Sequence, residues 1–338
     1  MRAFVISGPR DAGVVDVEPP TPDRGQVVVD VERVGVCGTD VDLFDGTMPY
    51  LLEGHERYPL RPGHEWSGTV SAIGPDVDER WRGARVTGDT MLGCGNCARC
   101  LRGRHHVCEN RYEIGIRGGW AGALAEQLLV PVTALHRLPD ELTATAGALV
   151  EPAGCALRAV EAASISAGDR VCVWGPGTLG LLILQFAKAR GAFVDVVGLD
   201  HDRLALAARL GAATTMLATE ADQVCQYDAV IDASTSPRAS AQAVRQVEPS
   251  GRIVLVGLAS TPSSIDTRDL VFNDITMVGI LAASAGLDGA IAMFASGAIE
   301  TDPLVAATVK LEDVADVLAG RRPANAGPGP KIHVDPRA

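Results

Sequence analysis

The chain has 338 residues, of which 47% are hydrophobic, 21% charged and 4% aromatic, and its formal net charge is −12. This composition predicts a globular protein of two domains, while the acidity and the low aromatic content argue against nucleic acid as a partner. The first residues hold no apolar secretion signal, and no apolar run is long enough to cross a membrane. We therefore expect a cytoplasmic protein with reduced cysteines and no membrane contact.

Residues 1–149 are rich in β-branched runs and in turns. QVVVDVERVGVCG and SGTVSAIGPDV read as strands bounded by glycine, proline and aspartate. The motif CGTD, residues 37–40, follows the first strand, and GHEWSG, residues 63–68, precedes the second. Taken alone, the cysteine and the histidine of these motifs are best interpreted as core residues.

The stretch CGNCARCLRGRHHVC holds four cysteines, namely Cys94, Cys97, Cys100 and Cys108. In a reducing compartment this spacing favours a four-thiolate zinc site over a disulfide framework. Four protein ligands leave no position for a substrate, so we predict a structural zinc in a lobe of about residues 90–110. The basic residues of the lobe would also suit nucleic acid, but the acidity of the whole chain argues against that.

Glu151 lies in the apolar segment LVEPAGCALRAV. An unpaired carboxylate is costly in such surroundings, and a nearby cation would offset that cost.

From about residue 169, short apolar strands alternate with helical stretches. GDRVCVWG, FVDVVGLD, DAVIDAS and GRIVLVGL predict a parallel sheet covered by helices on both faces. Between the first strand and its helix lies a G-x-G-x-x-G turn made by Gly175, Gly177 and Gly180, with Thr178 and Leu179 inside it. In this setting the motif predicts a dinucleotide pyrophosphate on the helix N-terminus, whereas the alternative is a buried helix with incidental glycines.

Together, CGTD, GHEWSG, the cysteine lobe, EPAGCALRA and GPGTLG resemble, in order and separation, the zinc-dependent medium-chain dehydrogenase/reductase family. The EP motif is most similar to its polyol, sugar and threonine dehydrogenase branch. The resemblance implies an α/β chain with a GroES-like catalytic domain over residues 1–149 and 284–338. A Rossmann domain over residues 150–283 completes it, with the active site in the cleft between the two.

The resemblance also implies an NAD(P)-dependent enzyme with two zinc ions per chain. It would oxidise a secondary hydroxyl of a polyol, sugar or amino sugar, such as an aminoglycoside-type intermediate, to the ketone. The expected assembly is a homodimer or homotetramer, joined at the sheet edge near GRIVLVGL and ITMVGIL.

By the same resemblance, Cys37 and His64 bind the catalytic zinc directly. Glu65 and Glu151 bind it directly or through water and exchange during turnover. Thr39 takes the substrate proton and Asp40 orients His64. Asp42 stands where many relatives carry a relay histidine, so it is either a proton acceptor or a solvated surface residue.

The cofactor preference rests on the end of the second Rossmann strand. Gly198 stands where NAD-binding members carry an acid, and glycine would admit a 2′-phosphate that His201 or Arg203 could bind. Asp200 would repel that phosphate and could instead bind the ribose. We expect NAD, with NADP as the alternative.

Two other functions compete with this one. The first is a zinc-free quinone or enone reductase of the same superfamily, which the set Cys37, His64, Glu65 and Glu151 argues against. The second is a non-catalytic zinc-binding module, which would leave that set and the glycine turn unexplained.

Overall fold

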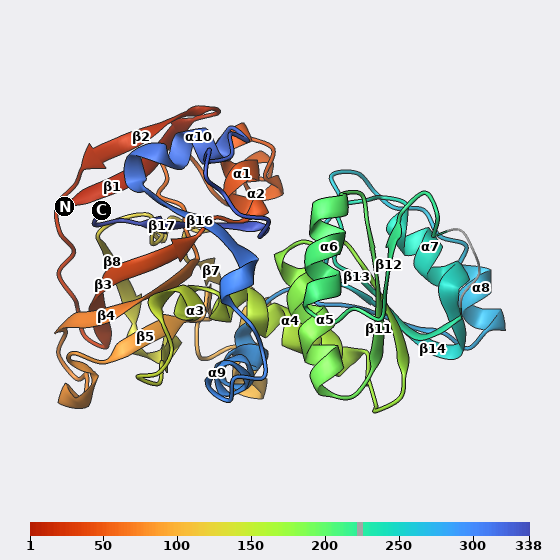
Figure 1. Cartoon of the computed structure of the whole chain (residues 1–338). Coiled ribbons are helices and arrows are strands. Elements are labelled where there is room, and N and C mark those ends of the chain that lie inside the picture. The colour runs from red at the N-terminus through yellow and green to blue at the C-terminus, as the bar shows by residue number, and fades with distance from the viewer. Residues whose placement is uncertain (222–225) are drawn as a thin grey trace. The chain divides into compact units, whose positions relative to one another are not determined.

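The computed structural model of the chain describes residues 1–221 and 226–338 (Figure 1). These residues form two units. Unit 1 comprises Met1–Glu151, Val305–Gly327 and Lys331–Ala338. Unit 2 comprises Pro152–Leu304 and Pro328–Pro330.

The segment 284–304 belongs to unit 2, whereas the sequence led us to expect it in the catalytic domain. The reason is visible in its contacts. The amide of Glu300 donates to Oε1 of Gln185 at 2.7 Å, and Nε2 of Gln185 donates back to the carbonyl oxygen of Glu300 at 3.1 Å. Gln185 is buried within a helix of unit 2, so this pair of bonds fixes the segment there.

Unit 1 is built around a seven-stranded sheet in the order β16-β17-β3-β4-β5-β9, with β8 also paired to β3. β16 and β17 are parallel, and the other neighbours are antiparallel. The strands of this sheet are β3 (Gln26–Gly35), β4 (Glu65–Ile73), β5 (Arg85–Gly88), β8 (Gln127–Pro131), β9 (Leu135–Arg137), β16 (Val305–Lys310) and β17 (Lys331–Asp335).

The core of unit 1 follows from the alternating pattern of β3. Val27, Val29 and Val31 are fully buried, and Trp66 of β4 joins them in the same hydrophobic cluster. β4 begins at Glu65, so the GHEW motif runs directly into the strand instead of lying in a loop before it. The pairing of β3 with β4 therefore decides which polar residues meet at the ends of these strands.

Smaller elements surround this sheet in unit 1. A hairpin of β1 and β2 and a short pair of β6 and β7 lie beside it. Their bounds, with those of the helices of unit 1, are β1 (Arg2–Gly8), β2 (Asp11–Asp16), β6 (Met91–Leu92), β7 (Tyr112–Glu113), α1 (Gly38–Asp45), α2 (Pro49–Leu52), α3 (Ala144–Ala148) and α10 (Val314–Leu318).

Unit 2 contains a six-stranded parallel sheet in the order β12-β11-β10-β13-β14-β15. Its strands are β10 (Arg170–Trp174), β11 (Phe193–Gly198), β12 (Thr214–Leu217), β13 (Tyr227–Asp232), β14 (Val247–Leu255) and β15 (Thr276–Gly279). This is the doubly wound order of a Rossmann sheet, so the predicted fold class is confirmed. GRIVLVGL lies in β14, one strand in from the edge, and only β15 of the expected contact region is an edge strand.

Helices cover both faces of this sheet, with α5 and α6 on one side and α7 and α8 on the other (Figure 1). The helices of unit 2 are α5 (Thr178–Ala189), α6 (His201–Arg209), α7 (Ala239–Gln246), α8 (Thr267–Phe272) and α9 (Leu287–Ala295), and α4 (Val150–Ala162) begins in unit 1 and continues into unit 2. Among the helices in residues 1–221 and 226–338, none has the length and apolar character that a membrane span requires.

Candidate metal centres and cofactor site

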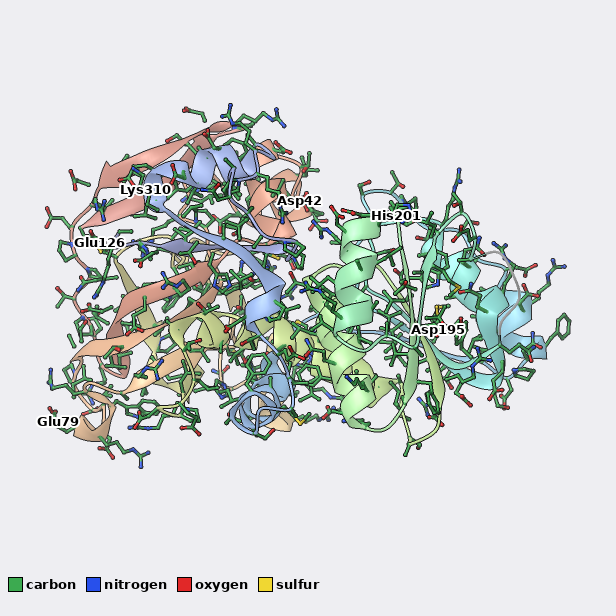
Figure 2. The ribbon with its side chains drawn as sticks, in the orientation of Figure 1. Asp42, Glu79, Glu126, Asp195, His201 and Lys310 are labelled. Carbon is green, nitrogen blue, oxygen red and sulfur yellow. The ribbon has the colours of Figure 1, made fainter. Side chains whose placement is uncertain are left out.

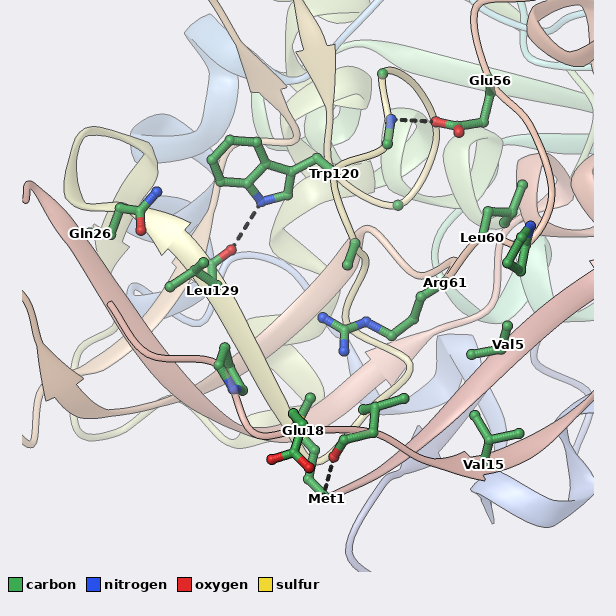
Figure 3. Close-up of a pocket in the computed structure, with 17 residues that line it drawn as sticks. Met1, Val5, Val15, Glu18, Gln26, Glu56, Leu60, Arg61, Trp120 and Leu129 are labelled. Carbon is green, nitrogen blue, oxygen red and sulfur yellow. Dashed lines mark hydrogen bonds between the residues drawn. The ribbon is translucent and has the colours of Figure 1, made fainter. Parts of the chain in front are cut away.

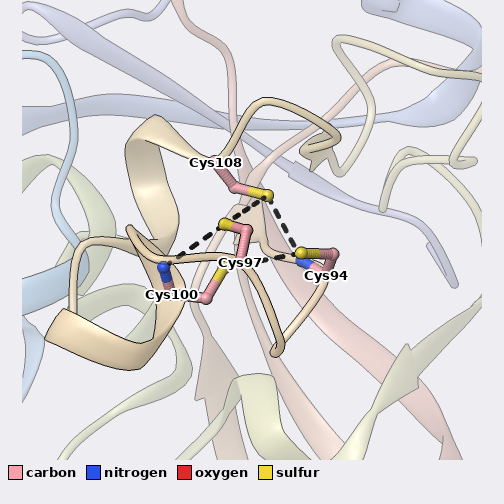
Figure 4. A group of neighbouring side chains, drawn as sticks. All are labelled: Cys94, Cys97, Cys100 and Cys108. Atoms are coloured by element: carbon pink, nitrogen blue, oxygen red, sulfur yellow. Dashed lines mark hydrogen bonds between the residues drawn. The ribbon is translucent and has the colours of Figure 1, made fainter.

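The four cysteines of the lobe converge on one point (Figure 4). The Sγ atoms of Cys97 and Cys108 are 3.8 Å apart, and those of Cys94 and Cys100 are 4.0 Å apart. A tetrahedron with metal–sulfur bonds of 2.3 Å has edges of about 3.8 Å, whereas a disulfide bond is about 2.05 Å long. None of these four cysteines is in a disulfide, so this donor set fits one tetrahedral zinc ion.

Backbone amides already favour thiolates in the lobe. The amide of Cys100 donates to Sγ of Cys97 at 3.5 Å, and this bond is the main reason why the pKa of Cys97 falls to about 6. The amide of Cys94 donates to Sγ of Cys108 at 3.4 Å. Desolvation instead raises the pKa of Cys100 to about 12. A divalent cation would displace that last proton, because the thiolate is the form that binds metal.

The lobe is tied to the rest of unit 1 by a pair that the sequence analysis missed. Nε2 of His105 lies 2.7 Å from Oδ2 of Asp89, which is buried between β5 and β6. This ion pair is the main reason why the pKa of His105 is raised. The spacing between a loop histidine and a strand-end aspartate gives no sequence signal for such a pair.

The second cluster joins Cys37, His64 and Glu65, whose ligand atoms lie within 4.8 Å of one another. Cys37 follows β3 and caps α1, while His64 directly precedes β4 and Glu65 begins it. The register of the two strands places Gly35 opposite Glu65. A Cβ on Gly35 would lie 2.2 Å from Oε2 of Glu65, so glycine is required for the carboxylate to enter the site.

Sulfur, nitrogen and oxygen donors of this kind are the protein ligands of zinc. Three of them leave one position open, which is the arrangement of catalytic zinc sites. The donor set of Cys37, His64 and Glu65 therefore fits a catalytic zinc ion, as the lobe fits a structural one.

Asp40 holds two of these ligands in place. Its side chain is fully buried, and Oδ2 accepts from the amide of Cys37 at 2.8 Å while Oδ1 accepts from the amide of Gly63 at 3.1 Å. Oδ1 also lies 3.6 Å from Nδ1 of His64. Burial acts to lower the pKa of His64, but Asp40 and Cys37 outweigh it, and the net effect raises the pKa well above its ordinary value.

Lys331 is a functional candidate that the sequence analysis missed. It begins β17, is 5% exposed, and its Nζ lies 2.8 Å and 2.7 Å from the two carboxylate oxygens of Glu65. Nζ also donates to the carbonyl oxygen of Val36 at 3.0 Å. Burial alone would lower the pKa of Lys331, but Glu65 outweighs it and the pKa is raised. The only sequence signal was a lysine opening the strand KIHVDP.

Glu151 lies at the start of α4 and is 9% exposed. Burial raises its pKa to about 7, and the charges of His64 and Glu65 act on it in opposite directions. Glu151 therefore shares the electrostatic surroundings of the second cluster, although its oxygens are outside the set of ligand atoms within 4.8 Å. The cost of this buried carboxylate, expected from the sequence, is present.

Thr39 and Asp42 both lie on α1. The hydroxyl of Thr39 is 3.9 Å from Sγ of Cys37, so it stands beside the cluster. Asp42, which Figure 2 labels, is half-buried on α1. Its Oδ1 accepts from the hydroxyl of Thr47 at 3.4 Å. Burial raises the pKa of Asp42.

The glycine turn joins β10 to α5. Gly177 caps the helix, and Thr178 and Leu179 form its first turn. A Cβ on Gly180 would lie 1.9 Å from the carbonyl oxygen of Gly175, so a glycine is needed where helix and strand come closest. The free amides of this helix end are suited to a pyrophosphate.

The end of β11 carries the residues that bear on cofactor choice. A Cβ on Gly198 would lie 2.6 Å from Cγ of Pro176, so this position has no room for an acidic side chain. Asp200 caps α6 by accepting from the amide of Asp202 at 2.8 Å. Its other oxygen lies 3.8 Å from Nε of Arg203. Asp200 thus has a structural role at the helix end, in addition to the role at the ribose that the sequence predicts.

Two family profiles match the chain. Residues 23–140 match the family described as "Alcohol dehydrogenase GroES-like domain", and residues 178–296 match "Zinc-binding dehydrogenase". Together they cover more than half of the sequence and include both metal-ligand clusters and the end of the glycine turn from Thr178 onward. Glu151 and the first part of the turn, Gly175 to Gly177, lie outside the matched ranges.

Curated relatives match over nearly the whole chain. The 2-dehydro-3-deoxy-L-galactonate 5-dehydrogenase of Pseudoalteromonas atlantica is 31% identical over 94% of this chain and 94% of its own length. The erythritol/L-threitol dehydrogenase of Mycolicibacterium smegmatis is 30% identical over 90% of this chain and 89% of its own length.

Solved structures agree with these matches. A zinc-binding dehydrogenase from Sinorhizobium meliloti 1021, bound to NADP, has a TM-score of 0.91 and 30% identity and covers 99% of both chains. The alcohol dehydrogenase rspB from Escherichia coli CFT073, in complex with NADH, has a TM-score of 0.90 and 26% identity and also covers 99% of both chains. The metal-ligand clusters and the glycine turn agree with these profile, sequence and structure matches. The chain therefore belongs to the zinc-dependent medium-chain dehydrogenase/reductase family, as an NAD(P)-dependent alcohol dehydrogenase.

Proposed function

We propose that this enzyme oxidises a secondary hydroxyl of a polyol or sugar to the ketone, with the chemistry located at Cys37, His64 and Glu65. The observation that carries the proposal is the convergence of these three donors beside the buried Glu151. Zinc bound there would polarise the substrate hydroxyl, and NAD(P) would accept the hydride. The lobe cysteines would hold the second, structural zinc.

The surrounding residues take the remaining tasks. The hydroxyl of Thr39, next to the Cys37 sulfur, accepts the substrate proton. Asp40 holds the segments of Cys37 and His64 in register. Asp42, one turn further along α1, is the acceptor that we propose at the end of the proton path. Glu65 and Glu151 would hold the zinc directly or through water and exchange during turnover, and Lys331, which donates to Glu65, would keep that carboxylate in place.

The substrate class is supported by the relatives. Their names describe enzymes that act on erythritol or L-threitol and on a deoxy sugar acid. These are polyhydroxylated compounds with secondary alcohols. The net charge of −12 would also suit a cationic amino sugar, such as an aminoglycoside-type intermediate, but no relative reported above bears a name that supports it. Polyols are therefore the first substrates to test.

For the cofactor we propose NAD, with the carboxylate of Asp200 on the ribose. Its side chain stands at the end of β11, where that acid is required, and Gly198 cannot supply it. NADP is the alternative, because Arg203 lies beside Asp200 and one structural neighbour holds NADP.

We further propose a homodimer or homotetramer that uses the edge strand β15. Val271 and Phe272 of the neighbouring α8 are 78% and 81% exposed, and Leu281 just after β15 is 52% exposed, which is unusual for large apolar side chains of a single subunit. The cytoplasmic location stays a prediction from the sequence.

The first experiment measures zinc per chain in the wild type, Cys37→Ala and Cys97→Ala, together with NAD and NADP reduction on a panel of polyols, sugars, amino sugars and L-threonine. We expect two zinc ions in the wild type and one in Cys37→Ala. We also expect Cys37→Ala to lose activity by at least about a thousandfold, since the metal supplies several kcal/mol of barrier lowering. One zinc in both wild type and Cys37→Ala would contradict the proposed catalytic site.

The cofactor proposal has its own test. Asp200→Ala should lower kcat/KM for NAD and raise it for NADP, while Arg203→Ala should leave NAD use within about twofold of wild type. A wild type that prefers NADP and loses that preference in Arg203→Ala would reverse the assignment.

A further inference from the structure

Unit 1 contains a cavity of about 760 Å³ that none of the proposed zinc ligands lines (Figure 3). Its walls come from the β1–β2 hairpin, the loop of residues 56–61, the loop of residues 115–121, and β8. The volume is typical of sites for small organic molecules, which measure about 300–1,000 Å³.

Arg61 is the charged group at the centre of this cavity. Figure 3 shows its guanidinium extending into the space between Trp120, Leu129 and Glu18. Nε of Arg61 is buried and has no hydrogen-bond partner among the described residues, and no acid lies within ion-pair distance of it there. Burial, with no opposing charge, lowers the pKa of Arg61 to about 10. Arg61 as a whole is partly exposed, so its guanidinium is accessible to a carboxylate or phosphate, the usual partners of such a group.

The position of Arg61 is fixed by its backbone. Its carbonyl oxygen accepts from the amide of Gly122 at 2.7 Å. The preceding residue, Leu60, exchanges backbone hydrogen bonds of 2.9 Å and 3.0 Å with Ile6 of β1. The guanidinium is therefore presented to the cavity by a segment that is bonded on both sides.

The two acids that line the cavity do not neutralise Arg61. Glu56 is buried, and its oxygens already accept from the amides of Arg57 at 2.9 Å and Gly119 at 2.8 Å. Glu18 is exposed, at the rim, and forms no ion pair within the described part of the chain, so its charge remains in water. Arg61 is thus the charged side chain inside the cavity, and its lining also includes the carboxylate of Glu18 and the N-terminal amine of Met1, which donates to the carbonyl oxygen of Val17 at 2.8 Å.

Apolar side chains make up much of the remaining wall. Val5, Leu60, Leu129 and Trp120 line it, and the indole of Trp120 has its only polar atom bonded to the carbonyl oxygen of Leu129 at 3.0 Å. We propose that this cavity binds a small monocarboxylate with an apolar body, its carboxylate on the guanidinium of Arg61 and its carbon chain against these four side chains.

A single negative charge fits better than a phosphate dianion. Arg61 offers one positive charge in a planar fork that pairs with a carboxylate through two parallel hydrogen bonds. The second charge of a dianion would be left to the amine of Met1, which already donates to the carbonyl oxygen of Val17, and it would face Glu18 and the net charge of −12. This site does not depend on the proposed dehydrogenase function, because its binding needs neither cofactor nor alcohol.

The test is calorimetric titration of the zinc-loaded full chain with sodium octanoate in a chloride buffer. We expect saturable binding of one octanoate per chain. Arg61→Gln should weaken it at least about tenfold, because an Arg–carboxylate pair is a strong charge-assisted bond. The matched control is Arg57→Gln, an exposed arginine on the same loop, which should bind octanoate as the wild type does.

Two further probes separate charge from carbon body. Octanol lacks the carboxylate and inorganic phosphate lacks the apolar chain, so each should bind at least about tenfold more weakly than octanoate. Phosphate binding as tight as octanoate would overturn the proposal in favour of a general anion site. Octanoate binding that is unchanged in Arg61→Gln would place the ligand elsewhere, for example on the catalytic metal.

The thermal unfolding of the variants tests the unpaired state of Arg61 directly. Arg61→Gln should unfold at the same temperature as the wild type or higher, because it removes a partly buried charge whose Nε has no partner among the described residues. A lower unfolding temperature, matched by Glu18→Gln, would mean that Glu18 pairs with Arg61 in solution, and the proposal would fail. Glu18→Gln that instead binds octanoate at least as tightly as the wild type supports it.

Discussion

The two metal-ligand clusters of unit 1 differ in how the chain assembles them. The lobe takes all four sulfurs from Cys94 to Cys108, a single short segment at the surface, where Cys94 is exposed. The second cluster takes its donors from the end of β3 and the start of β4, with Glu151 from α4 and Lys331 from β17 nearby. The first site can form locally, whereas the second exists only after the sheet has formed.

The clusters also differ in how they neutralise charge. In the lobe, the backbone amide of Cys100 favours the thiolate of Cys97, and solvent is close. In the second cluster, Glu65 and His64 are buried and each is matched by another side chain, Glu65 by Lys331 and His64 by Asp40. A buried charge whose partner is removed is much more costly than an exposed one, so substitutions should affect the two sites differently.

The largest effect on stability should come from Lys331→Met, which sharpens the contrast at the buried site. The carboxylate of Glu65 would remain desolvated without its partner, so the metal-free protein should lose about 3–5 kcal/mol of unfolding free energy. In the zinc-loaded protein the loss should be smaller, because the cation lies beside Glu65. Urea unfolding of both forms measures the difference.

Lys310→Met provides the matched control for this variant. Lys310 is an exposed lysine at the end of β16, the strand parallel to β17, and its loss should change stability by less than about 0.5 kcal/mol. Equal losses in the metal-free and zinc-loaded forms of Lys331→Met would show that Lys331 is only a packing residue.

Cys97→Ala should destabilise the cysteine lobe in the way that the loss of a crosslink destabilises a chain. A crosslink that closes about fifteen residues contributes about 3 kcal/mol, so the melting temperature should fall by about 6–12 °C. Limited proteolysis should then cleave between residues 94 and 108. Cys37→Ala should lose activity yet keep this segment resistant, and cleavage in both variants would break the distinction between the two clusters.

Glu151 gives the buried site a pH dependence of its own. In the metal-free protein its pKa is raised to about 7, from an ordinary value of 4.5, by burial. As the pH rises, the unfolded chain loses this proton before the folded protein does. The contribution of Glu151 to stability is therefore highest below pH 4.5 and falls as the pH rises to 7. The gap corresponds to about 3 kcal/mol at most.

Metal-free Glu151→Gln should remove this fall, while Glu161→Gln, at an exposed position of the same helix α4, should keep it. Urea unfolding between pH 5 and pH 8 is the measurement. Parallel curves for the wild type and Glu151→Gln would mean that Glu151 titrates normally and is not in the surroundings of the cluster. Zinc should flatten the wild-type curve, because a nearby cation lowers the pKa of a carboxylate.

The sequence predicted what is local and missed what depends on pairing. The cysteine spacing and the glycine turn each lie within about fifteen residues, so their chemistry follows from the motif alone. Lys331 reaches Glu65 only through the register of β17 on β3, and no pattern in either segment specifies that register. The domain boundary predicted near residue 284 differs from that of the structure for the same reason. The hydrogen bond that holds Glu300 in unit 2 comes from Gln185, which is far away in the sequence. β12, at four residues, was too short to be predicted.

The smallest effect should come from the pair that joins the lobe to the buried core, Asp89 and His105. Asp89 raises the pKa of His105 in the folded protein, so the pair contributes stability that is fully present below the unfolded pKa of about 6.5 and is lost as the pH rises through the higher folded pKa. His105 is 37% exposed, and solvent screening keeps the contribution below about 1 kcal/mol. Asp89→Asn should therefore be slightly less stable than the wild type at pH 6, and equal to it at pH 9. Because Asn can still accept from the amide of Met91, the local backbone bond should survive, and chemical shifts of the His105 ring should report the lowered pKa. A difference that stays constant from pH 6 to pH 9 would assign Asp89 a purely structural role that does not depend on the charge of His105.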